Sequence, residues 1–278
     1  MKYSISSKIR LNSGVAIPML GLGTWRAEGK ECTQAILWAF EAGYRHIDTA
    51  AYYGNEEAVG KAIQDSGLDR EEIFVTTKVW NDDHGYDNTI KACNNSLKRL
   101  NLDYIDLYLI HWPVSGRRIE TWKALEKLLN DGKARTIGVS NFMTSHLEEL
   151  LPNVEILPAI NQIEFNPYQY QKGLHQYCLM KYIQLEAFAP IVRARKFDDP
   201  KLLELCKIYD KKPAQILLRW AIQHDIIVIP KSVHKDRIIE NSMIFDFEIS
   251  DDDMTILDGF NEDYSILMWN PKKDPQFK

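Results

Sequence analysis

The sequence contains no long hydrophobic run and few cysteines. Its longest apolar stretches, such as residues 226–230, are far too short to cross a lipid bilayer. Residues 1–8 lack the apolar core of a signal peptide. The cysteines, which form no C-x-x-C pair, are Cys32, Cys93, Cys178 and Cys206. We therefore expect reduced cysteines in a cytoplasmic protein that does not enter a membrane.

An excess of basic charge is also absent. The chain carries 34 Lys and Arg against 39 Asp and Glu, so its net charge is −5, and its pI is near 5.8. This balance provides no basic field for nucleic acid or for an anionic membrane, and neither is an expected partner. No linker rich in glycine, serine or proline divides the sequence. With 278 residues, of which 45% are hydrophobic, we expect one domain over residues 1–278 and a monomer.

Strand-like and helix-like segments alternate through most of the chain. The expected strands cover residues 18–24, 45–48, 73–78, 105–111, 134–140, 159–164, 183–188 and 226–230. The helices expected after them cover residues 33–42, 56–65, 87–100, 119–130, 144–151, 170–180, 200–209 with 213–223, and 235–243. The strands are almost continuously apolar, as in a parallel sheet that is buried on both faces. Eight right-handed crossovers close such a sheet, so the sequence predicts an α/β fold with a single (β/α)8 TIM barrel.

Two further segments bear on this fold. Residues 8–17, with Asn-Ser-Gly in their middle, are typical of an N-terminal β-hairpin, which we place at the floor of the barrel. A doubly wound sheet is the alternative fold. The Gly-x-Gly at residues 21–23 supports it little, because it lacks the full dinucleotide-binding fingerprint and does not lead directly into a helix.

Chemically active side chains occur where the expected strands end. Asp48 ends the second strand, Tyr53 follows in the next loop, and Lys78 and His111 end the third and fourth strands. Functional residues of such barrels lie on the loops that follow the strands. A lysine at the end of an apolar strand is costly to bury unless it is paired, and Asp48 is its natural partner. Each residue alone has an ordinary structural explanation, but four in succession favour an active site.

These groups suit the delivery of a proton to a carbonyl oxygen. A free phenol has a pKa of about 10 and is a weak acid at neutral pH. The Lys78 ammonium stabilises phenolate and is expected to lower the pKa of Tyr53, while Asp48 holds the lysine in place. His111 can hydrogen-bond the substrate oxygen and orient it. Because none of these side chains is a reductant, a hydride has to come from a cofactor.

Five motifs in this order resemble those of the aldo-keto reductases. They are Asp-Thr-Ala-x-x-Tyr-Gly-Asn-Glu at 48–56, Lys78, His-Trp-Pro at 111–113, Gly-Val-Ser-Asn-Phe at 138–142 and Ile-Pro-Lys-Ser-Val at 229–233. The resemblance covers essentially the whole chain and implies an eight-stranded barrel. It also implies NADPH-dependent reduction of aldehydes and ketones to alcohols, with Tyr53 as the general acid, Asp48 and Lys78 as its tuning pair, and His111 orienting the carbonyl.

The resemblance implies a set of cofactor-binding residues as well. They are Ser140, Asn141 and Gln162 at the nicotinamide carboxamide, Phe188 stacked on its ring, Lys231, Ser232 and Arg237 at the 2′-phosphate, Glu240 and Asn241 at the adenine edge, and Thr24. A guanidinium fork fits a phosphate well, so we expect NADP(H), with NAD(H) as a weaker alternative. The alternative explanation for Lys231, Ser232 and Arg237 is that they form a basic helix N-terminus on the surface that binds no phosphate.

One loop departs from the family pattern. Residues 191–196 replace the usual Leu-Gly that precedes the pyrophosphate loop, so its conformation is left open. Its three basic residues either bind cofactor phosphates or form a solvated surface loop.

The seven tryptophans fall into two groups. Trp38, Trp122 and Trp220 lie among apolar residues at helical spacing and are expected in the core. The candidates for an aromatic substrate wall are Trp25, Trp80, Trp112 and Trp269. Trp269 and Met268 lie in a C-terminal loop that folds over the barrel mouth in this family, where they either line the pocket or pack on the rim. Tyr52 is expected to be a packing residue. The loops after the fourth and seventh strands are short, which suggests an open active site. In this the chain resembles the bacterial diketogluconate reductase and prostaglandin F synthase-like branch of the family.

Two other functions are alternatives. A metal-dependent barrel hydrolase would need a His-x-His pair on an early strand, and because the sequence has none, we expect no metal. The second alternative is a nucleotide-binding regulatory or structural protein of the same family without turnover. The full Asp-Tyr-Lys-His set argues against that role. We therefore expect an enzyme, an NADP-dependent aldo-keto reductase of the alcohol dehydrogenase type, that acts on a small-molecule carbonyl substrate.

Overall fold

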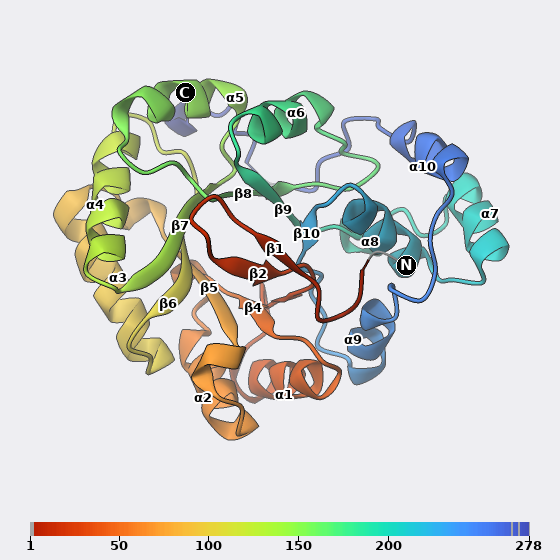
Figure 1. The fold of residues 1–278 in the computed structure, drawn as a ribbon, viewed down its shortest axis with the longest axis horizontal. Helices are drawn as coiled ribbons and strands as arrows, with labels where there is room; N and C mark the ends of the chain where they lie inside the picture. The colour runs from red at the N-terminus through yellow and green to blue at the C-terminus, as the bar shows by residue number, and fades with distance from the viewer. Residues whose placement is uncertain (1–2, 268, 272, 278) are drawn as a thin grey trace.

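The computed structural model describes residues 3–267, 269–271 and 273–277. Its centre is a sheet of eight parallel strands, each hydrogen-bonded to the strand that follows it in the chain. The strands are β3 (Leu22–Gly23), β4 (His46–Asp48), β5 (Phe74–Val79), β6 (Ile105–Ile110), β7 (Ala134–Ser140), β8 (Ile160–Glu164), β9 (Gln184–Phe188) and β10 (Ile227–Val228). Helices surround the sheet (Figure 1).

The sheet closes on itself. Parallel bridges join Leu20 to Val228 and Gly23 to Lys231, which connects the first strand to the last. The helices that connect the strands are α1 (Gly29–Glu41), α2 (Glu56–Ser66), α3 (Tyr86–Leu100), α4 (Arg118–Asn130), α5 (Thr144–Leu150), α6 (Lys172–Met180), α7 (Pro200–Tyr209) and α8 (Pro213–Gln223), with α9 (Lys235–Ser242) and α10 (Asp251–Asp258) after the last strand. The predicted (β/α)8 barrel is therefore confirmed.

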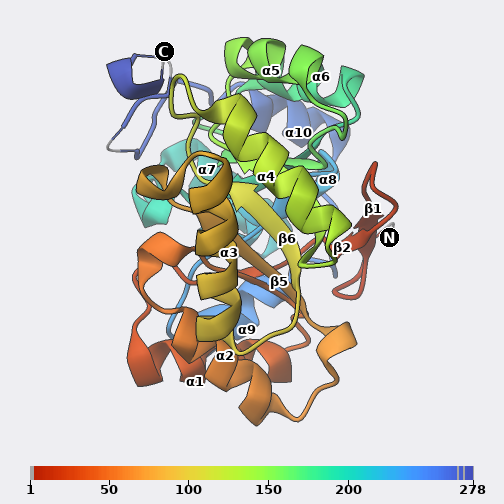
Figure 2. The ribbon, with the colours of Figure 1, turned by 90° about the vertical axis from the view of Figure 1, so that its left-hand side faces the viewer.

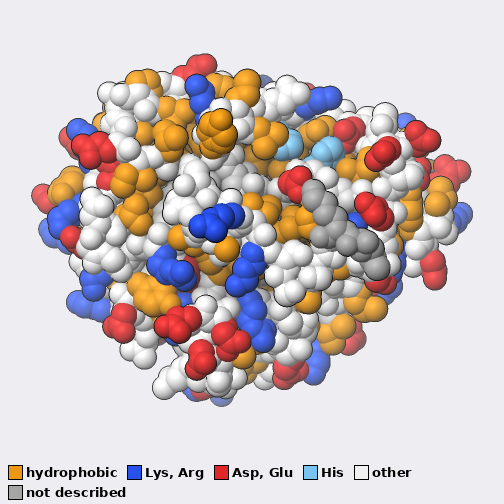
Figure 3. All heavy atoms as spheres, in the orientation of Figure 1, with side chains coloured by type: hydrophobic (Ala, Val, Ile, Leu, Met, Phe, Trp, Pro, Cys, Tyr) orange, Lys and Arg blue, Asp and Glu red, His pale blue; other side chains and the backbone are white. Residues whose placement is uncertain are grey.

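The predicted N-terminal hairpin is also confirmed. Strands β1 (Lys8–Arg10) and β2 (Ala16–Pro18) pair antiparallel. Leu11 and Ile17 of this hairpin form a small apolar core with strand residues Phe74, Leu107, Leu109, Ile160 and Ile227. Figure 2 shows the hairpin at one end of the barrel and the C-terminal segment at the other. Figure 3 shows the surface of the hairpin end, where basic and acidic side chains are interspersed.

The barrel interior changes from apolar to polar toward the carboxyl ends of the strands. Side chains alternate between the interior and the layer under the helices, so every second residue of a strand faces inward. Along β5 the inward residues are Phe74, then Thr76 and Lys78. Along β8 apolar Ile160 is followed by Gln162. The buried polar groups are thus concentrated near the mouth, opposite the hairpin.

Several boundaries differ from the expected ones. The first strand is only Leu22–Gly23, because Pro18 pairs with Lys8 in the hairpin. Strand β10 ends at Val228, and Pro230, two residues later, has no N–H with which to continue the ladder. Helix α10 was not expected, because the alternation of strands and helices was followed only to residue 243. It is capped by Ser250, whose Oγ accepts a hydrogen bond from the backbone N–H of Asp253 at 3.2 Å.

The core tryptophans also differ in burial. Trp122 and Trp220 are fully buried, as expected. Trp38 is partly buried and packs against the same core.

Close packing between α2 and α3 leads to a stability prediction. A Cβ atom on Gly60 would lie 2.2 Å from the carbonyl oxygen of Leu100, which is backbone and cannot rotate away. We expect Gly60→Ala to lower the free energy of unfolding by about 1–3 kcal/mol because the helices must separate. Urea unfolding followed by circular dichroism measures the change.

The matched control is Gly173→Ala in α6. A Cβ on Gly173 meets no atom within 4 Å, so this alanine should be neutral or stabilising by up to about 1 kcal/mol. Equal stabilities of the two variants would contradict the proposed close approach at Gly60.

Candidate active site

A buried ion pair between Asp48 and Lys78 forms the centre of the site. Asp48 ends β4 and Lys78 lies near the end of β5, with 3% and 0% of their side chains exposed. Lys78 Nζ donates to Asp48 Oδ2 at 2.6 Å and to the carbonyl oxygen of Thr49 at 2.8 Å. The Tyr53 hydroxyl oxygen lies 3.5 Å from the same nitrogen. Three acceptors thus match the three hydrogens of the ammonium group.

A pinned loop brings Tyr53 to this lysine. Tyr53 ends a 3₁₀ turn, η1 (Ala51–Tyr53), and Gly54 follows with φ 67°, a conformation that glycine adopts without strain. Asn55 then anchors the loop. Its amide donates to the carbonyl oxygen of Thr24 at 2.9 Å, and its Oδ1 accepts from the Thr49 hydroxyl at 2.6 Å. Because both partners follow strand ends, the phenol is held over the barrel interior.

The electrostatic environment keeps the proton on Tyr53. Burial raises the pKa of Tyr53 to about 12, although the Lys78 ammonium lowers it. The expected effect of Lys78 is present, but the expected net lowering of the pKa was wrong because burial outweighs it. Burial lowers the pKa of Lys78, while Asp48 and Tyr53 raise it by more, so the lysine stays charged. The site therefore holds a protonated phenol beside an ammonium group.

His111 follows β6 and faces the same space. Its ring lies 5.7 Å from the Tyr53 ring and 5.2 Å from the Trp80 ring, in edge-on contact with both. Burial, followed by the charges of Lys78 and His84, holds the pKa of His111 well below its usual value. The imidazole is therefore neutral at neutral pH and keeps one N–H that can donate a hydrogen bond.

A second buried carboxyl group, which the sequence analysis missed, lies next to this set. Gln162 Nε2 donates to Asp48 Oδ2 at 2.8 Å and to Glu186 Oε1 at 2.6 Å. Gln162 was expected at a nicotinamide carboxamide, yet its amide nitrogen is fully engaged by these two carboxyl groups. Glu186 lies in the middle of β9 and is completely buried. The sequence signal that could have identified Glu186 is the presence of a charged residue inside an otherwise apolar strand.

Other residues expected to bind the cofactor lie around this group. Asn141, with φ 63°, donates from Nδ2 to the carbonyl oxygen of His111 at 3.0 Å and to Ser140 Oγ at 3.1 Å. The hydroxyl group of Thr24 donates to the backbone oxygen of Asp48 at 2.9 Å. Phe188 ends β9 and is half-buried. These residues are brought together at the barrel mouth.

The residues expected at a 2′-phosphate lie in the segment after β10 and in the first turn of α9. Lys231 is half-buried, and burial lowers its pKa. Ser232 Oγ accepts from the backbone N–H of His234 at 3.1 Å, and Arg237 is exposed on α9. Asn241 is buried.

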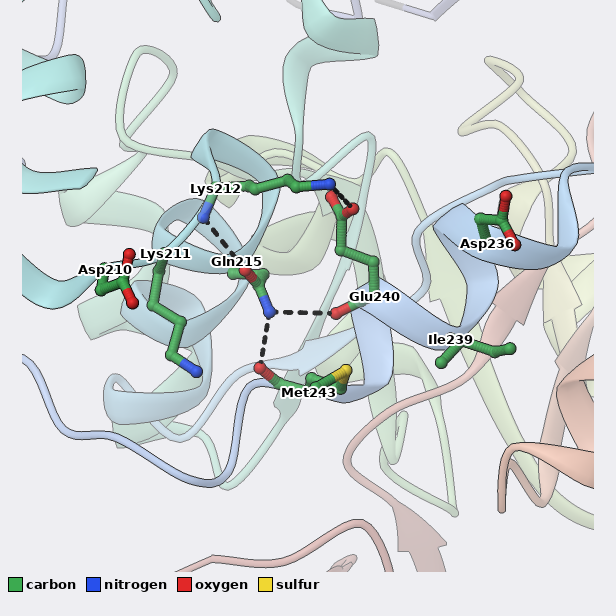
Figure 4. Close-up of a pocket in the computed structure, with 8 residues that line it drawn as sticks. All are labelled: Asp210, Lys211, Lys212, Gln215, Asp236, Ile239, Glu240 and Met243. Atoms are coloured by element: carbon green, nitrogen blue, oxygen red, sulfur yellow. Dashed lines mark hydrogen bonds and ion pairs between the residues drawn. The ribbon is translucent and has the colours of Figure 1, made fainter. Parts of the chain in front are cut away.

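Glu240 points toward a groove between α8 and α9. Its carboxylate forms an ion pair with Lys212, and its backbone oxygen accepts from Gln215 Nε2 at 3.3 Å (Figure 4). The carboxylate expected at the adenine edge is therefore already paired with a neighbouring helix.

The loop at residues 191–196 has an unusual backbone. Three consecutive residues, Val192, Arg193 and Ala194, have positive φ angles of 52°, 50° and 62°. This left-handed turn is strained, above all at β-branched Val192. Arg193 and Arg195 are exposed, whereas Lys196 forms an ion pair with Glu262. The basic groups of the loop thus divide into two exposed arginines and one paired lysine.

A continuous aromatic wall surrounds the mouth. Tyr52 stacks on Trp80 with ring centroids 3.7 Å apart and lies 5.8 Å from Trp25. Trp269 contacts both Trp80 and Trp112, at 5.8 and 5.4 Å. The four expected tryptophans are therefore brought together. Tyr52, expected to be a packing residue, packs between the rings of this wall and is 48% exposed.

The C-terminal segment completes the wall and is firmly anchored. Phe277, which the sequence analysis missed, stacks on Trp112 with centroids 5.0 Å apart and is buried. Arg118 Nη2 donates to the Phe277 carbonyl oxygen at 2.5 Å. Glu164 accepts from the backbone N–H of Ile266 at 2.9 Å. Met268, the other residue expected in this wall, lies outside the described residues.

No group of three or more His, Cys, Asp or Glu side chains in the described part of the chain is arranged to hold a metal ion. None of the described helices is long and apolar enough to span a bilayer.

Comparisons with known proteins show the family of the chain. Residues 19–262 match the model of the aldo/keto reductase family. The chain is 50% identical over 267 residues to "Glyoxal reductase" of Bacillus subtilis, with 96% of this chain and 97% of that protein covered. It is 45% identical over 250 residues to "Methylglyoxal reductase DkgA" of Escherichia coli, with coverage of 88% and 90%. The crystal structure of a Bombyx mori aldo-keto reductase in complex with NADP superposes with a TM-score of 0.92, at 40% identity and 99% coverage of both chains.

The buried ion pair can be tested apart from any activity. We expect Lys78→Met to lower the free energy of unfolding by about 3–5 kcal/mol because it leaves the Asp48 carboxylate buried without a partner. Adding Asp48→Asn should restore much of this loss. Urea unfolding of the three proteins measures both effects.

Lys61→Met is the matched control. Lys61 pairs with Asp65 on the surface of α2, where the two side chains are 60% and 36% exposed, so its loss should change stability little. If the two lysine variants were equally stable, the interior pair would not contribute to stability as proposed.

Proposed function

Because the chain belongs to the aldo/keto reductase family, we propose that it is an NADP(H)-dependent oxidoreductase that reduces aldehydes and ketones to alcohols. The single observation that carries this proposal is the contact of the Tyr53 hydroxyl with the Lys78 ammonium, 3.5 Å apart, inside a barrel mouth lined by aromatic rings. A regulatory protein without turnover would have no need for this arrangement.

In the proposed reaction Tyr53 is the general acid. When bound, NADPH supplies the hydride, which no side chain of the protein can provide. Tyr53 transfers its hydroxyl proton to the carbonyl oxygen as the alcohol forms. Lys78 stabilises the resulting phenolate, and Asp48 holds Lys78 through the 2.6 Å ion pair. Neutral His111 donates a hydrogen bond to the carbonyl oxygen and sets its orientation.

The residues at the mouth fit a phosphorylated dinucleotide. Arg26, Arg193 and Arg195 are exposed, and the charges of the first two lie near enough to influence each other. Arg26 is also close to half-buried Lys231. Such a group of cations suits a pyrophosphate and a 2′-phosphate, which supports NADPH over NADH.

We infer small α-dicarbonyl aldehydes as the substrate class. The names of two relatives, glyoxal reductase and methylglyoxal reductase, motivate this inference. The stacked rings of Trp25, Tyr52 and Trp80 would form an apolar wall for a compact substrate beside His111. A panel that includes glyoxal, methylglyoxal and bulkier ketones, followed by NADPH absorbance, tests the preference.

We also infer a monomeric, cytoplasmic enzyme. All groups of the site come from one chain, so no second copy is needed to complete it. The four cysteines are free thiols, three of them buried, which agrees with a reducing compartment.

The role of Tyr53 can be tested by removing one oxygen atom. Tyr53→Phe should lower kcat for carbonyl reduction by about 10²–10⁴-fold, because no general acid remains, while NADPH binding is kept. Fluorescence titration measures binding, and NADPH absorbance measures turnover. Tyr52→Phe is the matched control and should retain activity, since Tyr52 contributes its ring face. Normal turnover in Tyr53→Phe would remove Tyr53 from the proposed role.

The cofactor preference can be tested at Arg237. We expect Arg237→Ala to raise the KM for NADPH by about tenfold through loss of a charge-assisted contact with the 2′-phosphate. The KM for NADH, which lacks that phosphate, should stay unchanged. Steady-state kinetics with both cofactors provide the values, and an equal effect on both would contradict the assignment.

A further inference from the structure

Glu186 is a buried carboxyl group that the proposed reaction does not use. It lies in the middle of β9, in register with Gln162 on β8 and with Ile227 on β10. Its side chain points into the barrel, whereas its neighbours Leu185 and Ala187 pack in the core under the helices. An acidic residue at an inward position, completely shielded from water, is costly to keep charged unless it is paired and hydrogen-bonded.

The contacts of Glu186 connect it to the catalytic ion pair. Its Oε1 accepts from Gln162 Nε2 at 2.6 Å, and the same nitrogen donates to Asp48 Oδ2 at 2.8 Å. An amide nitrogen has two hydrogens, so both are used. The opposite orientation would place the Gln162 oxygen against the Asp48 carboxylate. Asp48 and Glu186, as the two acceptors, together hold the nitrogen of the Gln162 amide toward the ion pair.

The charges around Glu186 favour its neutral form. The titratable groups that face it are Asp48 from β4, Lys78 from β5 and Tyr53 from the turn after β4. The positive charge of Lys78 is already paired with Asp48. Glu186 Oε2 has no hydrogen-bond partner among the described residues. Burial, followed by the Asp48 charge, raises the pKa of Glu186 to about 8, although Lys78 and Gln162 lower it.

We propose that Glu186 is a positioning residue of the nicotinamide site. As a neutral carboxylic acid it holds the Gln162 amide against Asp48, and when it ionises it places a second anion beside the Asp48–Lys78 pair. That anion makes Tyr53 a weaker acid, since its charge raises the pKa of the phenol. Glu186 thereby limits carbonyl reduction on the alkaline side. This proposal rests on the proposed function for its catalytic consequence, but the ionisation itself is a property of the protein alone.

The first test uses the protein without cofactor. A carboxyl group whose pKa is raised from 4.5 to about 8 on folding stabilises the protein fully below pH 4.5, and this stabilisation is lost as the pH rises to about 8. Glu186→Gln keeps the acceptor but does not ionise. Its melting temperature relative to wild type should therefore rise by several degrees between pH 5 and pH 8.5. Parallel pH profiles of the two proteins would overturn the proposal.

The second test separates positioning from charge. Glu186→Leu removes the acceptor, so the Gln162 amide is no longer fixed, and the Kd for NADPH at pH 6 should rise about five- to tenfold. Glu186→Gln should bind NADPH as wild type does at that pH, which rescues the loss. Weak binding by both variants, or normal binding by both, would overturn the positioning role.

The third test measures the pH dependence of turnover. In Glu186→Gln the pH at which kcat for carbonyl reduction declines on the alkaline side should be about one unit higher than in wild type. The control is Glu56→Gln, because buried Glu56 pairs with Arg99 and accepts from Thr77 but does not contact Gln162. That variant should lose stability and keep the wild-type pH profile. An unchanged alkaline limb in Glu186→Gln would overturn the catalytic consequence.

The three tests distinguish the two proposals. If no carbonyl is reduced by wild type, the proposed function fails, while the stability profiles still decide whether Glu186 ionises as stated. If turnover is normal and the stability profiles of wild type and Glu186→Gln are parallel, only the inference about Glu186 fails.

Discussion

The whole site depends on burying the Asp48–Lys78 ion pair in the barrel interior. Taking two charges out of water costs several kcal/mol per ion, and their attraction compensates only when the remaining hydrogen-bonding positions are filled. The Thr49 carbonyl and the Tyr53 hydroxyl accept the remaining hydrogen bonds of the Lys78 ammonium, and the Gln162 amide donates a hydrogen bond to the Asp48 carboxylate. The groups that stabilise the pair are therefore the groups that form the proposed site, so folding and chemistry rest on the same contacts.

The barrel was predictable because its signal is local. Buried parallel strands are apolar and helices are amphipathic, and this alternation placed β7, α7 and α8 at their observed bounds. Errors occurred where a distant partner decides the structure. Pro18 joins the hairpin rather than the first barrel strand. Helix α10 depends on its Ser250 cap and on packing by few apolar residues, so periodicity alone did not reveal it.

The site was predictable in part, for a related reason. Asp48, Lys78 and His111 each follow or end an apolar strand, where a polar side chain needs an explanation. Glu186 is also a polar residue in an apolar strand. Its partner Gln162 lies on another strand, however, and only the strand register shows that the two residues are adjacent. The stacking of Phe277 on Trp112 joins residues far apart in the chain, about which periodicity says nothing. The net shift in the Tyr53 pKa depends on how deeply the phenol is buried and on how close it lies to Lys78. Neither quantity can be read from the sequence.

The charge distribution separates two tasks within one opening. In the interior, burial keeps His111 and Tyr53 uncharged, and the charges of Asp48 and Lys78 cancel. A neutral carbonyl group therefore enters with little electrostatic cost, whereas a carboxylate would lose its hydration beside Asp48 without gaining a free cation. The exposed arginines lie on loops at the rim, where an anionic group stays partly hydrated. Under the proposed function, phosphates belong at the rim and a small neutral dicarbonyl belongs inside, because exchanging the two would bury an unpaired anion.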